Sequence, residues 1–282
     1  MPPNPDHSDE MLRQRHAAIL RPASGYGFFI PALLAALLVY GLWHLGFSFT
    51  KFIIGIANLG NFVVLMFPPS WGDQDNLYRY VHALGETVAI AFLGTLLAAI
   101  IAFPLGFVAA RNTTASNVLR LISRRSFDTL RGADMLIWAL IWVNVVGLGP
   151  FAGVLAIMSS DIGSFGKLFS EAIEATDKRA TEGVLASGGS HVMGIRFGII
   201  PQVLPVLISQ VLYYFESNTR SATIIGIVGA GGIGLTLSEQ IRTLEWQTVC
   251  FLIILILLTV TAIDFLSTRL RRLIAGEQST TI

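Results

Sequence analysis

The stretch Glu182-Gly-Val-Leu-Ala-Ser-Gly-Gly-Ser190, followed by Ile199-Ile-Pro201, decides the fold that this sequence predicts. It is a polar and charged stretch between two strongly apolar segments. Within it, Glu182, Gly188 and Pro201 are spaced six and then thirteen residues apart. Apolar segments on both sides of a short polar stretch indicate a loop between two membrane spans.

This loop has the pattern of a short amphipathic helix over residues 181–190. The spacing of three and four residues places one set of side chains on a single side of that helix, namely Glu182, Leu185, Ala186 and Gly189. Gly188 and Gly189 suit a reversal at its C-terminal end, with one of them in the left-handed conformation. Such a helix can insert into a groove on a partner protein.

Composition agrees with a membrane protein. The chain has 282 residues, a mean hydropathy of +0.66, 53% hydrophobic residues and 13% charged residues, whereas about a quarter of the residues in a soluble domain are charged. The net charge of +1 gives no reason to expect a nucleic acid partner. The single cysteine permits no internal disulfide and sets no metal site.

Clean apolar runs predict membrane spans, because a helix of about 20 residues crosses a hydrocarbon core of about 30 Å. Four runs qualify: Phe28 to Thr50, Val88 to Ala110, Phe197 to Phe215 and Trp246 to Ile263. Between them, Met135 to Leu148 and Phe151 to Ser159 are split by Gly147-Leu-Gly-Pro150, which indicates a helix break or a tight turn. This region is either two spans or one broken re-entrant pair. The sequence thus predicts an all-α polytopic membrane protein with about six transmembrane helices.

Basic residues predict the orientation of these spans. With the N-terminus inside, the inner segments hold 15 of the 19 lysine and arginine residues: Arg13, Arg15, Arg21, Arg111, Arg120, Arg124, Arg125, Arg131, Lys167, Lys178, Arg179, Arg196, Arg269, Arg271 and Arg272. Both termini and the 181–190 loop are therefore expected in the cytoplasm. The expected organisation is a tail over 1–25, a first helix over 26–50, a periplasmic connection over 51–79, a core over 80–272 with its loop at about 171–198, and a tail over 273–282.

The 181–190 loop resembles the EAA loop of ABC-importer permeases, although Gly183-Val184 stands where that motif has Ala-Ala. Further segments are similar to the phosphonate-importer permease family, which includes phosphite and phosphate systems. They are Glu86 to Thr95, Pro104 to Arg111, Val146 to Val154, Phe215 to Ala222, Ile225 to Gly234 and Asp264 to Arg271. The resemblance covers roughly residues 80 to 272 and implies a type I importer core.

This resemblance implies a set of partners and a division of labour. The partners are a second copy of the chain, two ATP-binding cassette subunits, a periplasmic solute-binding protein and membrane lipid. ATP and Mg would bind the ATPase, since this chain has no Gly-x-x-x-x-Gly-Lys-Ser/Thr sequence. The chain is thus expected to lie in the bacterial inner membrane, to bind no cofactor and to catalyse no reaction. The residues expected to couple to the ATPase are Glu182, Leu185, Ala186, Gly188, Gly189 and Pro201.

Polar residues in or beside apolar runs are candidates for the translocation pathway. Glu216 and Arg220 lie four residues apart and can pair across one helical turn. Arg220 and the hydroxyl residues around it offer donors suited to a small oxyanion; an ion pair that ends the helix is the alternative. The candidates are Asn144, Glu216, Ser217, Asn218, Arg220 and Ser221.

Other functions are less compatible with this sequence. A secondary transporter would carry ionisable residues near the midplane of clean spans, and an intramembrane enzyme would need a catalytic cluster; neither pattern is visible. His82 and Glu86 share a helix face without a third metal ligand nearby, so no metal site is expected. A permease for phosphonate, phosphite, hypophosphite or phosphate is predicted, with a permease for another small solute, such as an amino acid, as the alternative.

Overall fold

The computed structural model describes residues 26–114 and 116–276. By its internal contacts the chain divides into two units, residues 1–64 and residues 65–282, which we call the N-terminal unit and the core unit. Every regular element in the described residues is helical, which confirms the expected all-α fold. The expected tail over 1–25 lies outside the described residues, as do residues 277–282 of the expected tail over 273–282. Residues 273–276 instead form the end of a helix.

The N-terminal unit contains two apolar helices, α2 (Tyr26–His44) and α3 (Phe49–Met66). The sequence predicted one span over 28–50 followed by a connection over 51–79. Instead the helix breaks after His44, where Gly46 has a φ of +66°, a conformation that favours glycine. Helix α3 then occupies part of the expected connection and is long and apolar enough to cross a membrane.

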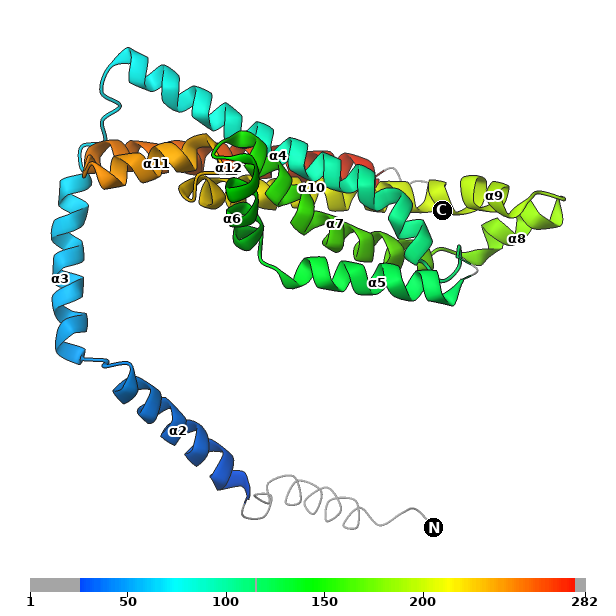
Figure 1. The fold of residues 1–282 in the computed structure, drawn as a ribbon, viewed down its shortest axis with the longest axis horizontal. Coiled ribbons are helices and arrows are strands. Elements are labelled where there is room, and N and C mark those ends of the chain that lie inside the picture. The colour runs from blue at the N-terminus through cyan, green and yellow to red at the C-terminus, as the bar shows by residue number, and fades with distance from the viewer. Residues whose placement is uncertain (1–25, 115, 277–282) are drawn as a thin grey trace, which may run out of the picture. The chain divides into compact units, whose positions relative to one another are not determined.

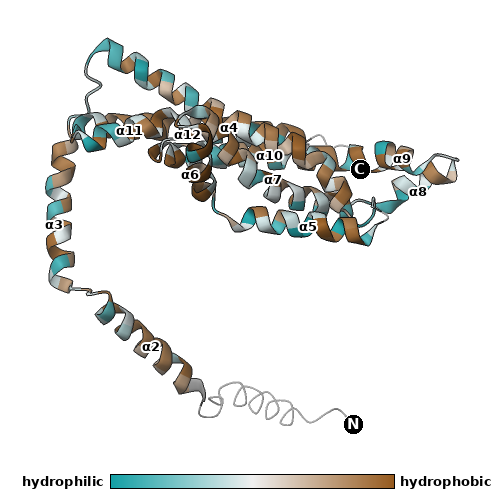
Figure 2. Ribbon diagram, in the orientation of Figure 1, coloured by the Kyte–Doolittle hydropathy of each residue, from teal (hydrophilic) through white to brown (hydrophobic). Residues whose placement is uncertain are grey.

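The core unit is built on four long helices, which are α4 (Gln74–Ala109), α7 (Pro150–Glu174), α10 (Ile200–Ile227) and α12 (Trp246–Gly276) (Figure 1). The apolar run 246–263 lies within α12, and the run 88–110 lies within α4 except for Ala110, the C-cap residue. Shorter helices join them: α5 (Asn117–Gly132), α6 (Met135–Val146), α8 (Lys178–Ala186), α9 (His191–Met193), the π-helical turn η1 (Gly194–Ile199) and α11 (Gly232–Arg242). In Figure 2 hydrophobic residues dominate the middle of α4 and α10, whereas the beginning of α4 and the end of α11 are hydrophilic.

The break expected around Gly147-Leu-Gly-Pro150 is confirmed. Helix α6 ends at Val146 and α7 begins at Pro150, and Gly147 and Gly149 have φ values of +94° and +134°. The run 151–159 is only the first part of α7, which continues to Glu174. Upstream, α5 and α6 meet at 86°, so the chain bends sharply before and after α6.

Small residues allow α4 and α7 to pack closely. A side chain at Gly94 would collide with Ile157, and one at Gly106 would collide with Phe169. Such positions let membrane helices approach until their backbones nearly touch. Phe169 and its stacked neighbour Phe165 belong to a core cluster that also includes Ile199 and Val203. This cluster joins the helices beside the loop that carries α8.

Four described helices are long and apolar enough to cross a membrane, or five if the bent α5–α6 pair counts as one span. They are Phe49–Met66, Gln74–Ala109, His191–Ile227 and Trp246–Ile274. The sequence predicted about six. The count differs because α6, with 12 residues, is too short to span a membrane alone, and because α7 combines its apolar start with polar residues such as Asp161.

Candidate functional site

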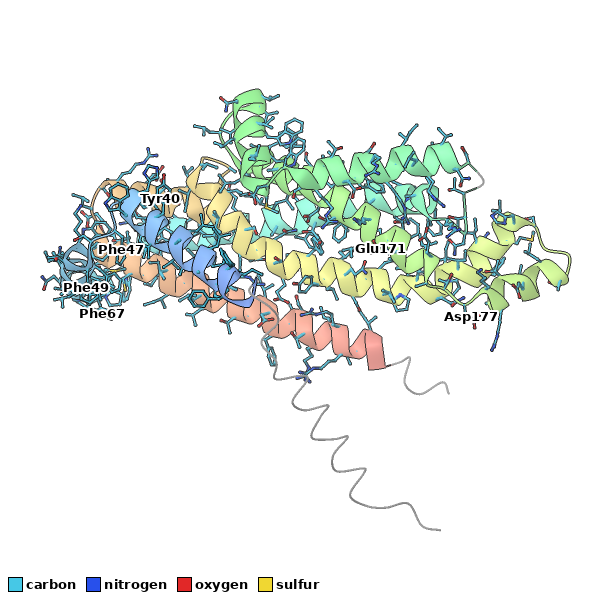
Figure 3. The ribbon with its side chains drawn as sticks, turned by 90° about the horizontal axis from the view of Figure 1, so that it is seen from below. Tyr40, Phe47, Phe49, Phe67, Glu171 and Asp177 are labelled. Atoms are coloured by element: carbon cyan, nitrogen blue, oxygen red, sulfur yellow. The ribbon has the colours of Figure 1, made fainter. Side chains whose placement is uncertain are left out.

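Helix α8 projects from one end of the core unit, away from the end formed by α11 and the beginning of α4 (Figure 1). Figure 3 labels Asp177 where the chain turns into α8. Its side chain caps the helix by accepting a hydrogen bond of 2.9 Å from the Arg179 backbone N–H. This cap starts the helix at Lys178, three residues before the predicted start at Thr181.

The end of α8 is a complete Schellman turn. The N–H of Gly188 donates to the carbonyl of Leu185 and the N–H of Gly189 donates to the carbonyl of Val184, each at 3.0 Å. Gly188 has a φ of +87°. The predicted glycine reversal is therefore confirmed, although the helix stops at Ala186 rather than continuing to Ser190.

A groove formed by two glycines of η1 holds α8 in place. Gly194 and Gly198 are spaced four residues apart, and both face Thr181 of α8. A side chain at Gly198 would lie 2.9 Å from the Thr181 Cα atom. This groove was not predicted from the sequence, yet the Gly-x-x-x-Gly spacing is a recognised signal for close helix packing.

Gln202 of α10 clamps the beginning of α8. Its Oε1 accepts a hydrogen bond from the Asp177 backbone N–H at 3.0 Å, and its Nε2 donates to the Asp177 carbonyl at 3.2 Å. The same Nε2 donates to the Gly198 carbonyl at 2.6 Å. The cap of α8 is thus tied directly to α10, next to Pro201 in its first turn.

Helix α8, the turn after it and the α9–η1 segment form a hairpin over residues 178–199, which we call the α8 hairpin. The tip of the α8 hairpin is apolar and exposed. Leu185, Val192 and Met193 are 42%, 73% and 51% exposed. Glu182 and Ala186 are exposed as well, so the predicted coupling residues of α8 share an accessible surface. An apolar tip with a charged flank is suited to insertion into a groove on another protein.

Charged residues brace the base of the hairpin. Glu174 at the end of α7 accepts hydrogen bonds from the backbone N–H of Arg111 at 2.5 Å and from Arg124 Nη2 at 2.9 Å. A cavity of about 570 Å³ is lined by Arg111, Asn112, Glu174 and Lys178. These contacts join the α4–α5 connection to the point where the chain enters α8.

On α10 the predicted pair of Glu216 and Arg220 is present, and a third residue joins it. Glu216 Oε1 accepts from Arg220 Nη2 at 3.2 Å, while Oε2 accepts from Arg271 Nη2 of α12 at 2.8 Å. The Glu216 side chain is only 9% exposed. Arg271 was not predicted at this site, because the sequence indicated only that it is one of the basic residues of the inner segments.

Asn218 lies in a different, fully buried network. Its Nδ2 donates to Asp161 of α7 at 2.5 Å and to Thr95 of α4 at 2.8 Å. All three residues are at most 2% exposed. Both amide hydrogens of Asn218 are therefore used to join α4, α7 and α10, because an asparagine side chain carries two donor hydrogens.

The remaining pathway candidates are distributed over two helices. Ser217 and Ser221 are half-buried on α10 beside Arg220. Asn144 is exposed on α6 and donates to the carbonyl of Leu140 in its own helix at 2.7 Å. Ser217 and Ser221 thus lie beside Arg220 on α10, whereas Asn144 lies on a different helix and its hydrogen bond to Leu140 stays within that helix.

The glycine-rich segment after α10 packs backbone against backbone. The Gly149 N–H donates to the Gly229 carbonyl at 3.0 Å. The turn between α6 and α7 therefore contacts the turn between α10 and α11. A side chain at Gly231 would lie 2.7 Å from the Pro150 nitrogen. Among the described residues no cluster of three or more His, Cys, Asp or Glu side chains could hold a metal ion.

Several curated relatives align with most of this chain. HtxC of Stutzerimonas stutzeri, whose name assigns it to phosphite transport, is 44% identical over 80% of this chain and 79% of its own length. The phosphite transport system permease protein PtxC of the same organism is 32% identical over 86% of this chain and 87% of its length. The phosphate-import permease protein PhnE of Mycolicibacterium smegmatis is 33% identical over 84% of this chain and 44% of its length.

Solved structures support the fold. A structure of the MetNI methionine ABC transporter in an inward-facing conformation matches with a TM-score of 0.61 and 18% identity, over 72% of this chain and 99% of the matched chain. A second crystal form matches with a TM-score of 0.62. Residues 102–276, which include α7, the α8 hairpin, α10 and all of α12, match the family model of binding-protein-dependent transport system inner membrane components. The chain belongs to that family and is an inner-membrane permease component of an ABC transport system.

Proposed function

We propose that this permease is the membrane subunit of an ATP-driven importer of phosphorus oxyanions. The observation that carries the permease role is the projecting α8 hairpin, which is capped by Asp177, clamped by Gln202 and apolar at its tip. The names of relatives that align with at least four fifths of this chain support phosphite or phosphate as solutes.

The assembly that we propose contains two copies of this permease, two ATPase subunits and a periplasmic solute-binding protein. ATP and Mg bind to the ATPase subunits, and the permease binds no cofactor of its own. The α8 surface of Glu182, Leu185, Ala186, Gly188 and Gly189 docks in a groove on the ATPase. Closure of the ATPase pair then displaces α8, and Gln202 transmits this displacement to α10 next to Pro201.

The α8 end of the core unit faces the cytoplasm in this proposal. Basic residues of several elements lie toward that end, including Arg111, Arg124, Lys178, Arg179 and Arg196, in agreement with the positive-inside rule. Helix α12 then ends in the cytoplasm and α4 begins in the periplasm. A cytoplasmic N-terminus requires the N-terminal unit to cross the membrane an odd number of times, so only one of α2 and α3 would span it.

For the solute, we propose a route along the open face of α10. Arg220 has 49% of its side chain exposed, and Ser217 and Ser221 are half-buried beside it. A guanidinium with neighbouring hydroxyl groups presents several donors to oxyanion oxygens. The buried position of Asn218 and the separate position of Asn144 favour supporting roles for these two residues.

Reconstitution tests the whole assignment. The permease, its ATPase and its binding protein are placed in proteoliposomes, and ATP-dependent uptake of ³²P-labelled inorganic phosphate and of phosphite is measured beside that of methionine. We expect uptake of at least one phosphorus oxyanion, no methionine uptake, and no ATP hydrolysis by the isolated permease. Methionine uptake without oxyanion uptake would support an amino-acid permease instead, and ATPase activity of the permease alone would refute the division of labour.

A further inference from the structure

The carboxylate of Glu216 is shared by two guanidinium groups. The Glu216 side chain is 9% exposed, and each carboxylate oxygen accepts a hydrogen bond from a different arginine: Oε1 from Arg220 and Oε2 from Arg271. One negative and two positive charges leave this cluster with a formal excess of one positive charge. One guanidinium can therefore leave the carboxylate without depriving it of a charged partner.

The two arginines are held differently. Arg271 makes the shorter bond to Glu216, at 2.8 Å, donates to Thr268 Oγ1 at 3.3 Å and lies 5.7 Å from the ring centroid of Tyr213. Arg220 makes its bond at 3.2 Å and has 49% of its side chain exposed, against 28% for Arg271. Arg220 is therefore the more exposed and the less tightly bound of the two arginines, and Arg271 still neutralises Glu216 when Arg220 is released.

We propose that Arg271 is a positioning residue that keeps Glu216 neutralised, so that Arg220 can exchange this carboxylate for the transported oxyanion. The inference rests on the function proposed above. Glu216 is then the resident anion of the site and occupies Arg220 when no solute is present. Without Arg271, Glu216 would be a buried carboxylate with Arg220 as its single charged partner. Separating that pair would leave an unpaired buried charge, which is strongly unfavourable.

A purely structural role predicts different behaviour for the same residues. If Arg271 only fastened α12 to α10, its removal would lower stability and transport whether or not residue 216 carried a charge. If it acts on transport through Glu216, then its removal matters only while the carboxylate is present. The two roles are separated by a double-mutant cycle, because such a cycle isolates the interaction between two residues.

The test measures phosphate uptake per ATP hydrolysed by the reconstituted complex, with binding protein saturated with inorganic phosphate. We expect Arg271→Ala to lower this ratio by about tenfold, within the range of couplings between contacting residues, and Arg271→Lys to keep most of it. Glu216→Gln combined with Arg271→Ala should transport as well as Glu216→Gln alone. The matched control is Arg272→Ala, which removes the same charge from an exposed neighbouring position on α12 and should leave the ratio unchanged.

Wild-type uptake by Arg271→Ala would overturn the proposal. So would a double variant that is about tenfold worse than Glu216→Gln at equal protein level, since Arg271 would then act without the carboxylate. If Arg271→Ala does not accumulate, Glu216→Gln and its combination with Arg271→Gln give the same comparison without an unpaired buried carboxylate. A wild-type complex that carries neither phosphate nor phosphite refutes the proposed function itself, whereas oxyanion uptake without this pattern refutes the role of Arg271 alone.

Discussion

Gly198 of η1 is one of the residues that hold α8 in place, and replacing it by alanine should loosen the hairpin. A Cβ atom at position 198 would lie 2.7 Å from Thr181 Oγ1, 2.9 Å from its Cα and 3.0 Å from its nitrogen. The hydroxyl can rotate away, but the backbone atoms can move only with α8. Overpacking of this kind costs about 1–3 kcal/mol, so we expect Gly198→Ala to destabilise the docked position of α8 by that amount.

Gly183 offers a matched control on the same hairpin. It lies inside α8, and a Cβ atom there would meet nothing within 4 Å. Alanine in a helix interior is more stable than glycine by about 1 kcal/mol. The same chemical change, Gly183→Ala, should therefore stabilise α8, whereas Gly198→Ala should weaken its attachment.

Hydrogen exchange of the backbone amides in α8, followed by mass spectrometry on the purified complex, measures both effects. A change of 1 kcal/mol alters the open population about fivefold. We therefore expect exchange to slow about fivefold in Gly183→Ala and to accelerate at least about fivefold in Gly198→Ala. ATP-driven uptake should fall only in Gly198→Ala. Equal shifts in the two variants, or unchanged protection of α8 in Gly198→Ala, would show that Thr181 does not hold the hairpin through this contact.

Three further predictions concern other contacts. Asn218→Ala leaves the buried Asp161 without its donor and should lower the apparent Tm by roughly 5 °C. Asp161→Asn keeps an acceptor and should lower the Tm less. The same Tm for wild type and both variants would argue against the network. Glu182→Lys should leave membrane insertion intact and weaken co-purification of the ATPase, and normal co-purification with normal uptake would show that α8 is not the contact. Glu174→Gln removes a half-exposed ion pair with Arg124 and should cost less than about 1 kcal/mol in thermal unfolding, so a larger loss would reveal a cooperative cluster.

Local signals in the sequence were sufficient for much of the fold. Apolar runs located α4, the α10 span and α12, and the Gly147-to-Pro150 break was visible because glycine and proline act on their own backbone. The Schellman turn at Gly188 was predictable for the same reason. The beginning of α8 was not predicted correctly, because it is fixed by a contact between Asp177 and Gln202, which lie 25 residues apart.

Contacts between distant positions explain what the sequence did not reveal. Asn218 meets Thr95 across 123 residues, and Glu216 meets Arg271 across 55. Each partner is unremarkable on its own helix, and only packing decides which of several nearby polar groups it meets. Arg271 lies four residues after the buried Ser267 and so shares its side of α12.

Helix α10 connects the two parts of the site. Gln202 binds the cap of α8, and Glu216 lies 14 residues further along the same helix, a rise of about 21 Å. Between them Pro205 removes one backbone donor, which weakens the helix on the side of α8. Beyond that point Asn218 fixes α10 to α4 and α7, and Arg271 fixes it to α12. In the coupling that we propose, a displacement of α8 therefore reaches the Glu216–Arg220 pair as a movement of α10 against three anchored neighbours. Arg220, the half-exposed member of that cluster, is the group with the freedom to respond.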